Sequence, residues 1–207
     1  MGRLLIFSLC IIILLAFSCN DKNGHRVTKH RISILPFKGT DTNAINVIKA
    51  KLEERLNAGI ITEQQKELPL FAYYEPRKRY VADSLLIYLE DYNAGKDFDK
   101  IIGITNSDIS TRKDSHANWG VMGLAYCPGE ACVISSFRVK KTSRNWDHYI
   151  DRMVVLAMHE LGHTYSLPHC KSNPCIMRDA EGKMNLDNGK NYCGSCHSYL
   201  KRKGVLK

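Results

Sequence analysis

The chain has 207 residues, 44% of them hydrophobic and 25% charged, and its formal net charge is +9. The length suits one domain, and this composition excludes an intrinsically disordered chain. A basic protein can bind nucleic acid, but no nucleic-acid-binding motif accompanies the charge. We therefore attribute the charge to solubility and to the basic C-terminal tail, and we predict no nucleic-acid partner.

The N-terminal segment has the features of an export signal. Residues 4–17 are an apolar run that would span about 21 Å as a helix, which is short of a bilayer core of about 30 Å. We predict a signal peptide over residues 1–18 rather than a retained membrane helix. The stretch that ends at Cys19 resembles a bacterial lipoprotein box, so Cys19 is the expected lipidated residue. Residues 19–30 would then tether a domain of residues 31–207 to a bacterial membrane, facing the periplasm or the cell surface; a soluble secreted protein is the alternative.

The first half of that domain shows alternating strand and helix patterns. Apolar runs predict strands, and apolar residues three and four apart predict helices. The predicted strands or extended segments are residues 31–37, 68–76 and 100–105, and the predicted helices are residues 42–58 and 79–92. Gly59 and Gly95 are expected to end the two helices as C-terminal caps.

A hairpin is predicted around the sequence CPGEAC. Residues 120–126 and 132–139 are apolar, and Pro128 with Gly129 between them is a turn signal. Cys127 and Cys132 would face each other across this turn. We expect them to form a disulfide in an oxidising compartment; two free thiols are the alternative.

A third helix is predicted from Asn145 to Ser166, with Asn145 or Asp147 as its N-cap. One of its faces is apolar and should point to the core; it comprises Ile150, Val154, Ala157 and Leu161. The opposite face carries His159 and His163. The chain after this helix is irregular and rich in cysteine. The pattern as a whole predicts an α+β fold, with a small mixed sheet, an active-site helix and a cysteine-rich C-terminal subdomain.

The two histidines of this helix have the spacing of metal ligands. Side chains four residues apart on a helix are neighbours, with Cβ atoms about 5–6 Å apart, so the imidazoles of His159 and His163 can converge on one ion. Zinc suits nitrogen ligands. Glu160 is one residue further round the helix, where its carboxylate can act as general base on a water at the metal.

A third ligand is expected from His169. If the helix continued, His169 would lie about 9 Å beyond His163 and could not reach the ion. The helix must therefore stop near Ser166 and the chain must reverse, and Pro168 favours this break. A sharp reversal often needs a positive φ, which glycine adopts most easily. Serine at this position indicates a strained or looser turn.

The segment HELGHTYSLPH resembles the motif of the metzincin metallopeptidases, with Ser166 in place of the usual glycine. The cysteines that follow, together with Met177, make it similar to the archaemetzincins in particular. The resemblance implies a catalytic zinc bound by His159, His163 and His169, with Glu160 as general base. It also implies that Met177 forms the methionine turn beneath the metal, and that residues 120–126 form an edge strand that receives substrate.

The last four cysteines form a second candidate metal site. Cys170, Cys175, Cys193 and Cys196 have a spacing suited to a structural, tetrahedral zinc. Two disulfides are the competing interpretation, and the resemblance favours zinc. We therefore expect two zinc ions per chain, one catalytic and one structural.

The sequence thus predicts a monomeric zinc-dependent peptidase that hydrolyses peptide or protein substrates. The alternative is a catalytically weak or inactive zinc-binding surface lipoprotein that acts as a binding module. Glu160 favours the enzyme, because a purely structural metal site does not need a general base. Ser166 favours the alternative, because it puts the geometry of the turn in question.

Overall fold

The computed structural model describes residues 29–179 and 186–207. The predicted signal peptide and Cys19 lie outside these residues, as does the tether up to residue 28. Among the helices that are described, none combines the length and hydrophobicity needed to cross a membrane.

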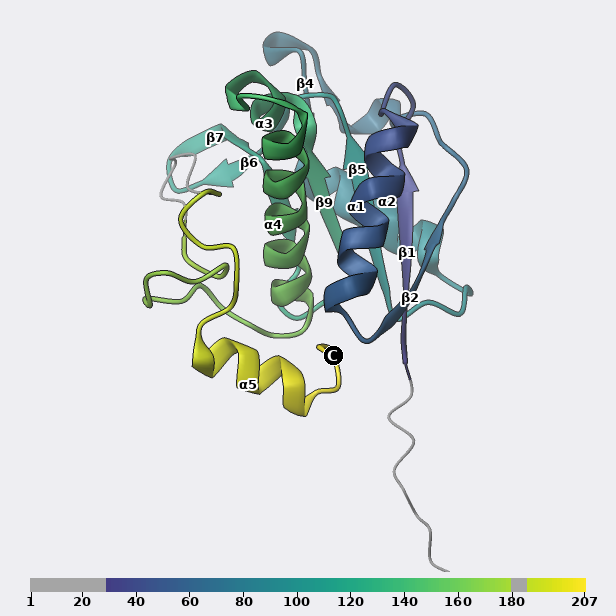
Figure 1. Cartoon of the computed structure of the whole chain (residues 1–207). Helices are drawn as coiled ribbons and strands as arrows, with labels where there is room; N and C mark the ends of the chain where they lie inside the picture. The colour runs from purple at the N-terminus through teal and green to yellow at the C-terminus, as the bar shows by residue number, and fades with distance from the viewer. Residues whose placement is uncertain (1–28, 180–185) are drawn as a thin grey trace, which may run out of the picture.

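A five-stranded mixed sheet forms the centre of the domain (Figure 1). Its strand order is β2-β1-β5-β9-β8, and every neighbouring pair is parallel except β8 and β9, which are antiparallel. The strands are β1 (His30–Pro36), β2 (Ala58–Thr62), β5 (Lys100–Thr105), β8 (Gly123–Ala125) and β9 (Ala131–Ser135). The predicted hairpin is confirmed by the pairing of β8 with β9, and β8 is an edge strand of this sheet.

Helices cover both faces of the sheet. The helices α1 (Thr42–Arg55) and α4 (Trp146–Thr164) lie side by side on one face, and α2 (Ala82–Asn93) covers the other (Figure 1). Each face has its own cluster of buried apolar side chains. The short α3 (Ser136–Thr142) leads from β9 into α4, and α5 (Gly194–Arg202) lies across the end of α4.

A second sheet of four short strands, in the order β3-β4-β6-β7, extends the domain beyond β8. Its members are β3 (Tyr73–Tyr74), β4 (Arg79–Val81), β6 (Ile109–Lys113) and β7 (His116–Val121); two 3-10 turns, η1 (Leu70–Ala72) and η2 (Glu75–Arg77), flank β3. Only Met122 separates β7 from β8. The two strands therefore follow each other almost directly and together line one side of the cleft described below.

Several predicted boundaries are wrong because tertiary pairing overrides the local pattern. The helix α1 ends at Arg55, and Gly59 lies in β2, paired with Arg31, rather than capping the helix. Residues 79–81 form strand β4, which pairs with β3 and β6, before α2 begins at Ala82. The strand predicted over residues 132–139 ends at Ser135, whose hydroxyl accepts a hydrogen bond from the Phe137 N–H and starts α3.

Candidate active site

The helix α4 begins and ends as its sequence predicts. The Asn145 side chain caps it by accepting a hydrogen bond from the His148 N–H, at 2.9 Å. At the other end Ser166 has a φ of 75°, and the Leu167 N–H donates to the Gly162 carbonyl at 3.0 Å. This closes the helix and reverses the chain towards His169. The predicted reversal is confirmed, and serine holds the left-handed conformation that glycine would adopt with less strain.

The reversal brings the three predicted histidines together. One ring nitrogen from each histidine lies within 4.8 Å of one ring nitrogen of the other two. The Nε2 atoms of His159 and His163 are 3.0 Å apart, and the ring centroids of His163 and His169 are 4.8 Å apart. His159 and His163 are held by α4, whereas His169 comes from the loop after Ser166 and is about half-exposed.

Hydrogen bonds to the backbone orient the two helical histidines for a metal. His159 Nδ1 is 2.7 Å from the Ile176 carbonyl, and His163 Nδ1 is 2.7 Å from the Leu167 carbonyl. A carbonyl only accepts, so each Nδ1 carries the hydrogen and each Nε2 presents a bare lone pair. Two lone pairs that face each other at 3.0 Å cannot hydrogen-bond, but they fit a shared cation. Tetrahedral zinc would place such nitrogens about 3.3 Å apart.

Burial keeps these rings neutral, which is the form that binds metal. Desolvation and the neighbouring His163 lower the pKa of His159 to about 4. Burial also lowers the pKa of His163. Both rings are therefore uncharged at neutral pH and ready to coordinate, so the donor set fits zinc.

Glu160 lies against the edge strand at a glycine. The Glu160 side chain is buried, and a Cβ placed on Gly123 would overlap its carboxylate. Gly123 therefore makes the space that Glu160 occupies, a role that our sequence analysis missed. A glycine inside a predicted strand was the available signal, because it often marks a close approach of another group. Burial raises the pKa of Glu160 to about 8, which is near neutral pH and so suits a group that must both take up and release a proton.

Met177 packs under the same turn of α4. It is fully buried, and a Cβ on Gly162 would overlap its sulfur. Met177 follows Ile176, whose carbonyl accepts from His159, and the Met177 carbonyl accepts from the Cys170 N–H at 2.7 Å. The segment around Met177 thus links the histidine group to the cysteine group.

The four C-terminal cysteines are brought together as a second group. Their Sγ atoms all lie within 4.8 Å of one another, and all four are free thiols. The Sγ atoms of Cys170 and Cys193 are 3.8 Å apart, which is about the separation of two thiolates on a tetrahedral zinc. The backbone N–H of Cys196 lowers the pKa of Cys193 to about 6, which favours a thiolate there. This donor set also fits zinc, and the disulfides considered from the sequence do not form.

The predicted disulfide between Cys127 and Cys132 is wrong in this structure, because both are free thiols. Cys132 is fully buried on β9, on the face that packs against α4. Cys127 is exposed, and its thiol donates to the Leu167 carbonyl at 3.6 Å. The two sulfurs therefore belong to different environments, although β8 and β9 do form the expected hairpin.

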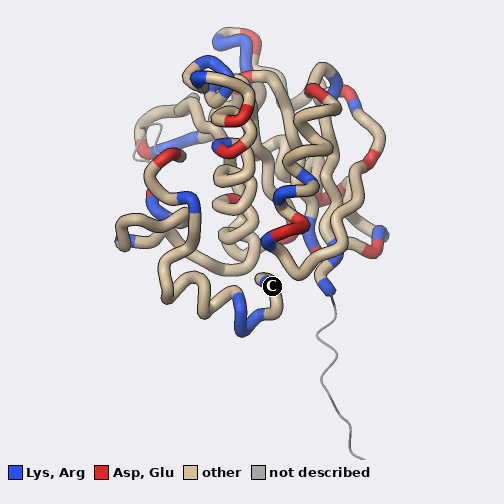
Figure 2. The backbone as a smooth tube through the Cα atoms, viewed as in Figure 1, with Lys and Arg blue, Asp and Glu red and all other residues tan. Residues whose placement is uncertain are grey.

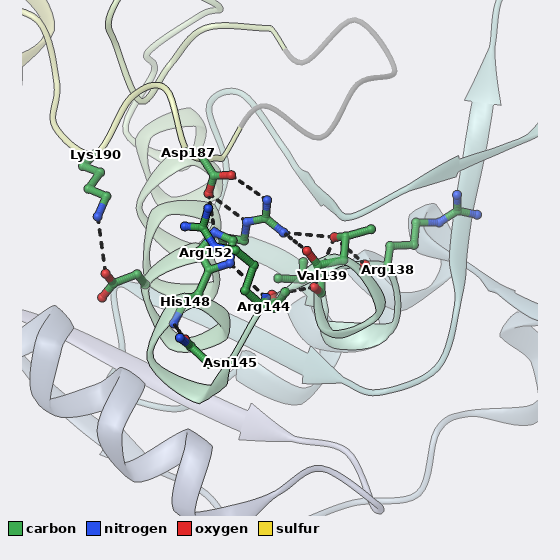
Figure 3. Close-up of polar contacts among 11 residues, drawn as sticks. Arg138, Val139, Arg144, Asn145, His148, Arg152, Asp187 and Lys190 are labelled. Atoms are coloured by element: carbon green, nitrogen blue, oxygen red, sulfur yellow. Dashed lines mark hydrogen bonds and ion pairs between the residues drawn. The ribbon is translucent and has the colours of Figure 1, made fainter.

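An ion-pair cluster ties the C-terminal loop to α4 (Figure 3). The Arg152 guanidinium donates to both oxygens of Asp187, at 2.8 and 2.6 Å, and His148 Nε2 is 2.8 Å from Asp187 Oδ1. Arg152 also donates to the Thr142 carbonyl, at the end of α3. Arg152 is almost fully buried, so this cluster fixes the loop that starts at residue 186 against the helix.

A cleft of about 1110 Å³ runs over these groups. The three histidines and Glu160 line it, the β7–β8 strands form one wall, and Leu186, Asn188 and Gly189 contribute from the C-terminal loop. Such a cleft, with an edge strand beside residues that could hold a metal ion, can hold an extended chain next to that ion. Together, the fold and the site define a zinc metallopeptidase.

Comparison with known proteins identifies the family. The chain belongs to Peptidase family M54, whose family model matches residues 38–202. The archaemetzincin of Halobacterium salinarum is 29% identical over 174 residues, which cover 80% of this chain and 96% of the relative. The archaemetzincin of Nanoarchaeum equitans is 32% identical over 146 residues, which cover 70% of this chain and 75% of the relative.

Solved structures show the same relationship. The crystal structure of archaemetzincin from Methanopyrus kandleri matches with a TM-score of 0.71 and 25% identity, covering 86% of this chain and 97% of that one. The archaemetzincin of Archaeoglobus fulgidus, solved in complex with malonate, matches with a TM-score of 0.68 and 25% identity, covering 82% and 99%. The predicted α+β fold and the resemblance to archaemetzincins are therefore confirmed.

Proposed function

We propose that this metallopeptidase hydrolyses peptide or protein substrates with His159, His163 and His169 as ligands of the catalytic zinc and Glu160 as general base. The proposal rests on the Nε2 atoms of His159 and His163, which lie 3.0 Å apart and each present a lone pair. In each ring the Nδ1 hydrogen is donated to a backbone carbonyl, which fixes the orientation of the ring. A half-buried pair of this kind suits a shared cation, and Glu160 comes from the same helical turn.

A zinc ion held there supplies Lewis acidity towards the substrate carbonyl and lowers the pKa of a water molecule. Glu160 accepts a proton from the attacking water and delivers it to the leaving amine. The buried side chain of Glu160 is held beside Gly123, where it lines the cleft. The free edge of β8 offers backbone hydrogen bonds that would align the substrate as an added strand.

The experiment that tests this proposal compares the wild type with Glu160→Gln. Zinc per chain is measured by elemental analysis, and cleavage of a mixed peptide library is followed by mass spectrometry. We expect both proteins to bind zinc equally, and the variant to lose activity by about 10²- to 10⁴-fold, the usual contribution of a general base. Equal rates in the two proteins, or no cleavage by either, would overturn the proposal.

We also propose that Cys170, Cys175, Cys193 and Cys196 hold a second, structural zinc, so that the chain binds two ions. The 3.8 Å separation of two sulfurs and the absence of disulfides among these four thiols support it. Cys193→Ser should lower the zinc content by one ion per chain and lower the free energy of unfolding. A zinc content that does not change in this variant would contradict the second site.

The alternative function is a zinc-binding module with little or no catalysis. The strained φ of Ser166 is the observation that favours it, because it shows that the reversal to His169 is not built with the usual residue. The two functions differ in one outcome. A binding module would retain peptide affinity in wild type and Glu160→Gln alike, and would cleave none of the library.

We further propose that the protein is exported and acts as a monomer at a bacterial membrane, anchored through a lipid on Cys19. The support is the sequence of residues 1–19. Metabolic labelling with an alkyne fatty acid should mark the wild type and not Cys19→Ser. Labelling of both proteins equally, or of neither, would contradict the lipid anchor. The monomeric state is tested separately, by measuring the mass of the purified domain with light scattering.

A further inference from the structure

The charges that line the cleft are strongly unequal. Among the residues that the structure describes, six lysine or arginine side chains and three carboxylates line it. The basic residues are Arg79, Arg112, Lys113, Arg138, Lys141 and Arg178. One of the three carboxylates is Glu160, which the proposed chemistry already uses. The remaining charges make the cleft basic, and most of the basic residues come from the second sheet and α3.

Part of this positive charge is neutralised within the wall itself. Asp108, just before β6, accepts hydrogen bonds from Arg138 at 2.8 and 3.1 Å and forms an ion pair with Arg79 at 3.1 Å. Two guanidinium groups therefore share one nearly buried carboxylate, and the cluster keeps a net charge of +1. A Cβ on Gly120 would overlap the Arg138 guanidinium, so this cluster lies directly against β7.

Further along the same wall, Arg112, Lys113 and Lys141 form no ion pair with any residue in the described ranges 29–179 and 186–207. Aromatic rings that also line the cleft hold two of them. Lys113 Nζ lies 5.6 Å from the centre of the Trp119 ring, and Lys141 Nζ lies 3.7 Å from the centre of the Phe137 ring. Such cation–π contacts keep an ammonium group beside the cleft without neutralising it. Figure 2 shows the basic segments of the β6–β7 hairpin and of the α3 region near the same end of α4.

The strand path gives the distance from this basic wall to the reaction centre. Glu160 lies against Gly123 and the Arg138 guanidinium lies against Gly120, three residues earlier on the β7–β8 path. At about 3.3 Å per residue, Gly120 and Trp119 lie at most about 10 and 13 Å from Gly123. A substrate bound as an added strand rises by the same amount per residue. The basic wall would therefore meet substrate side chains three to four positions from the bond that is cleaved.

We infer that the wall formed by the Arg79–Asp108–Arg138 cluster together with Arg112, Lys113 and Lys141 selects substrates with an acidic side chain three to four positions from the cleaved bond, on one side of it only. This inference rests on the proposed peptidase function and names the substrate class of the same site. The exposed ammonium groups are solvated, so their effect is moderate and falls as salt screens them.

The test uses decapeptides that differ only in having Asp, Asn or Lys at the third or fourth position on either side of one cleavable bond. We expect kcat/KM to fall in the order Asp, Asn, Lys on one side of the bond, by roughly threefold to tenfold for each step, mainly through KM. Raising the salt concentration should compress the order. Equal values for the three peptides at all positions would overturn the inference.

Charge-reversal variants test whether the basic residues of this wall cause the preference for Asp. Lys141→Glu, and separately Arg112→Glu with Lys113→Glu, should remove or invert the preference for Asp over Asn and Lys. Lys140→Glu is the matched control, because Lys140 is the exposed neighbour of Lys141 in α3 but does not line the cleft. A preference that survives both reversals, or that Lys140→Glu changes equally, would contradict the assignment.

A binding measurement separates this inference from the proposed function. The same decapeptides are titrated into Glu160→Gln and their affinity is measured by fluorescence anisotropy. If the wild type cleaves none of the peptides, the peptidase proposal fails, whereas tighter binding of the Asp peptides still supports the charge selection. Equal affinity for the Asp and Lys peptides would reject the charge selection whatever the activity.

Discussion

The sulfur of Met177 occupies the space that a side chain on Gly162 would need. Gly162 lies in α4 between the two proposed ligands His159 and His163, and Met177 lies beside the carbonyl that fixes His159. The glycine therefore lets the C-terminal loop approach the helix closely, and that approach orients the His159 ring. Glycine costs a helix interior about 1 kcal/mol relative to alanine, so its presence here has a packing reason.

Gly162→Ala should therefore destabilise the protein in spite of the better helix propensity of alanine. Overpacking typically costs about 1–3 kcal/mol and the propensity gain is about 1 kcal/mol, so we expect the free energy of unfolding to fall by about 1 kcal/mol. Zinc affinity, measured by competition with a chelator, should also fall. In a Met177→Ala background the same substitution should stabilise the helix. Additive effects of the two substitutions would contradict this packing relationship.

Gly123→Ala should reduce activity while leaving the zinc content unchanged. The added Cβ displaces the Glu160 carboxylate, and displacement of a general base costs about 10²-fold or more in kcat. Hydrolysis rates and zinc content are measured together. Gly59→Ala is the matched control, because a Cβ on this strand glycine meets nothing within 4 Å. Unchanged kcat in Gly123→Ala would show that Glu160 does not need this position.

Ser166→Gly should stabilise the protein. Serine at a φ of 75° carries strain of about 1 kcal/mol that glycine does not. We expect the free energy of unfolding, measured by urea titration, to rise by about 0.5–1 kcal/mol, with equal or higher activity. Ser166→Ala keeps the strain and serves as the control for loss of the hydroxyl. A less stable glycine variant would mean that the serine side chain contributes more than its backbone costs.

The ion pairs of Asp187 should make the free energy of unfolding depend on pH in the acidic range. Hydrogen bonds from Arg152, and then the contact with His148, hold the pKa of Asp187 well below its usual range. A folded-state pKa below the unfolded value of about 3.9 gives a stabilisation that is present above that pH and is lost as the pH falls below it. Asp187→Asn should therefore be less stable than the wild type at pH 7.

The difference between Asp187→Asn and the wild type should shrink steadily in urea titrations between pH 5 and pH 2. Solvent screening limits its size, because the Asp187 side chain is 43% exposed. The KM for peptides should rise in the variant at pH 7, since the loop from residue 186 lines the cleft. A difference in stability that is constant across this pH range would show that the ion pairs contribute little.

Local patterns in the sequence were enough for the parts of the site that lie on one element. The spacing of His159 and His163, the N-cap at Asn145 and the reversal at Ser166 follow from helix geometry, which depends only on residues a few positions apart. The strands β1 and β5 were also predicted, because their short apolar runs are likewise local patterns. The second sheet was not, because its short strands are stable only through pairing with one another, and this pairing overrides the local preference.

The sequence by itself determined which side chains we propose for the chemistry of this family M54 peptidase: the histidines, Glu160 and the four cysteines at metal-ligand spacing. Only the tertiary structure decided what surrounds them. It placed Gly123 against Glu160, kept Cys127 and Cys132 apart, and set the basic residues of the second sheet and α3 beside the cleft. These relationships join segments far apart in the chain, and their distances exist only once the two sheets and α4 have packed together.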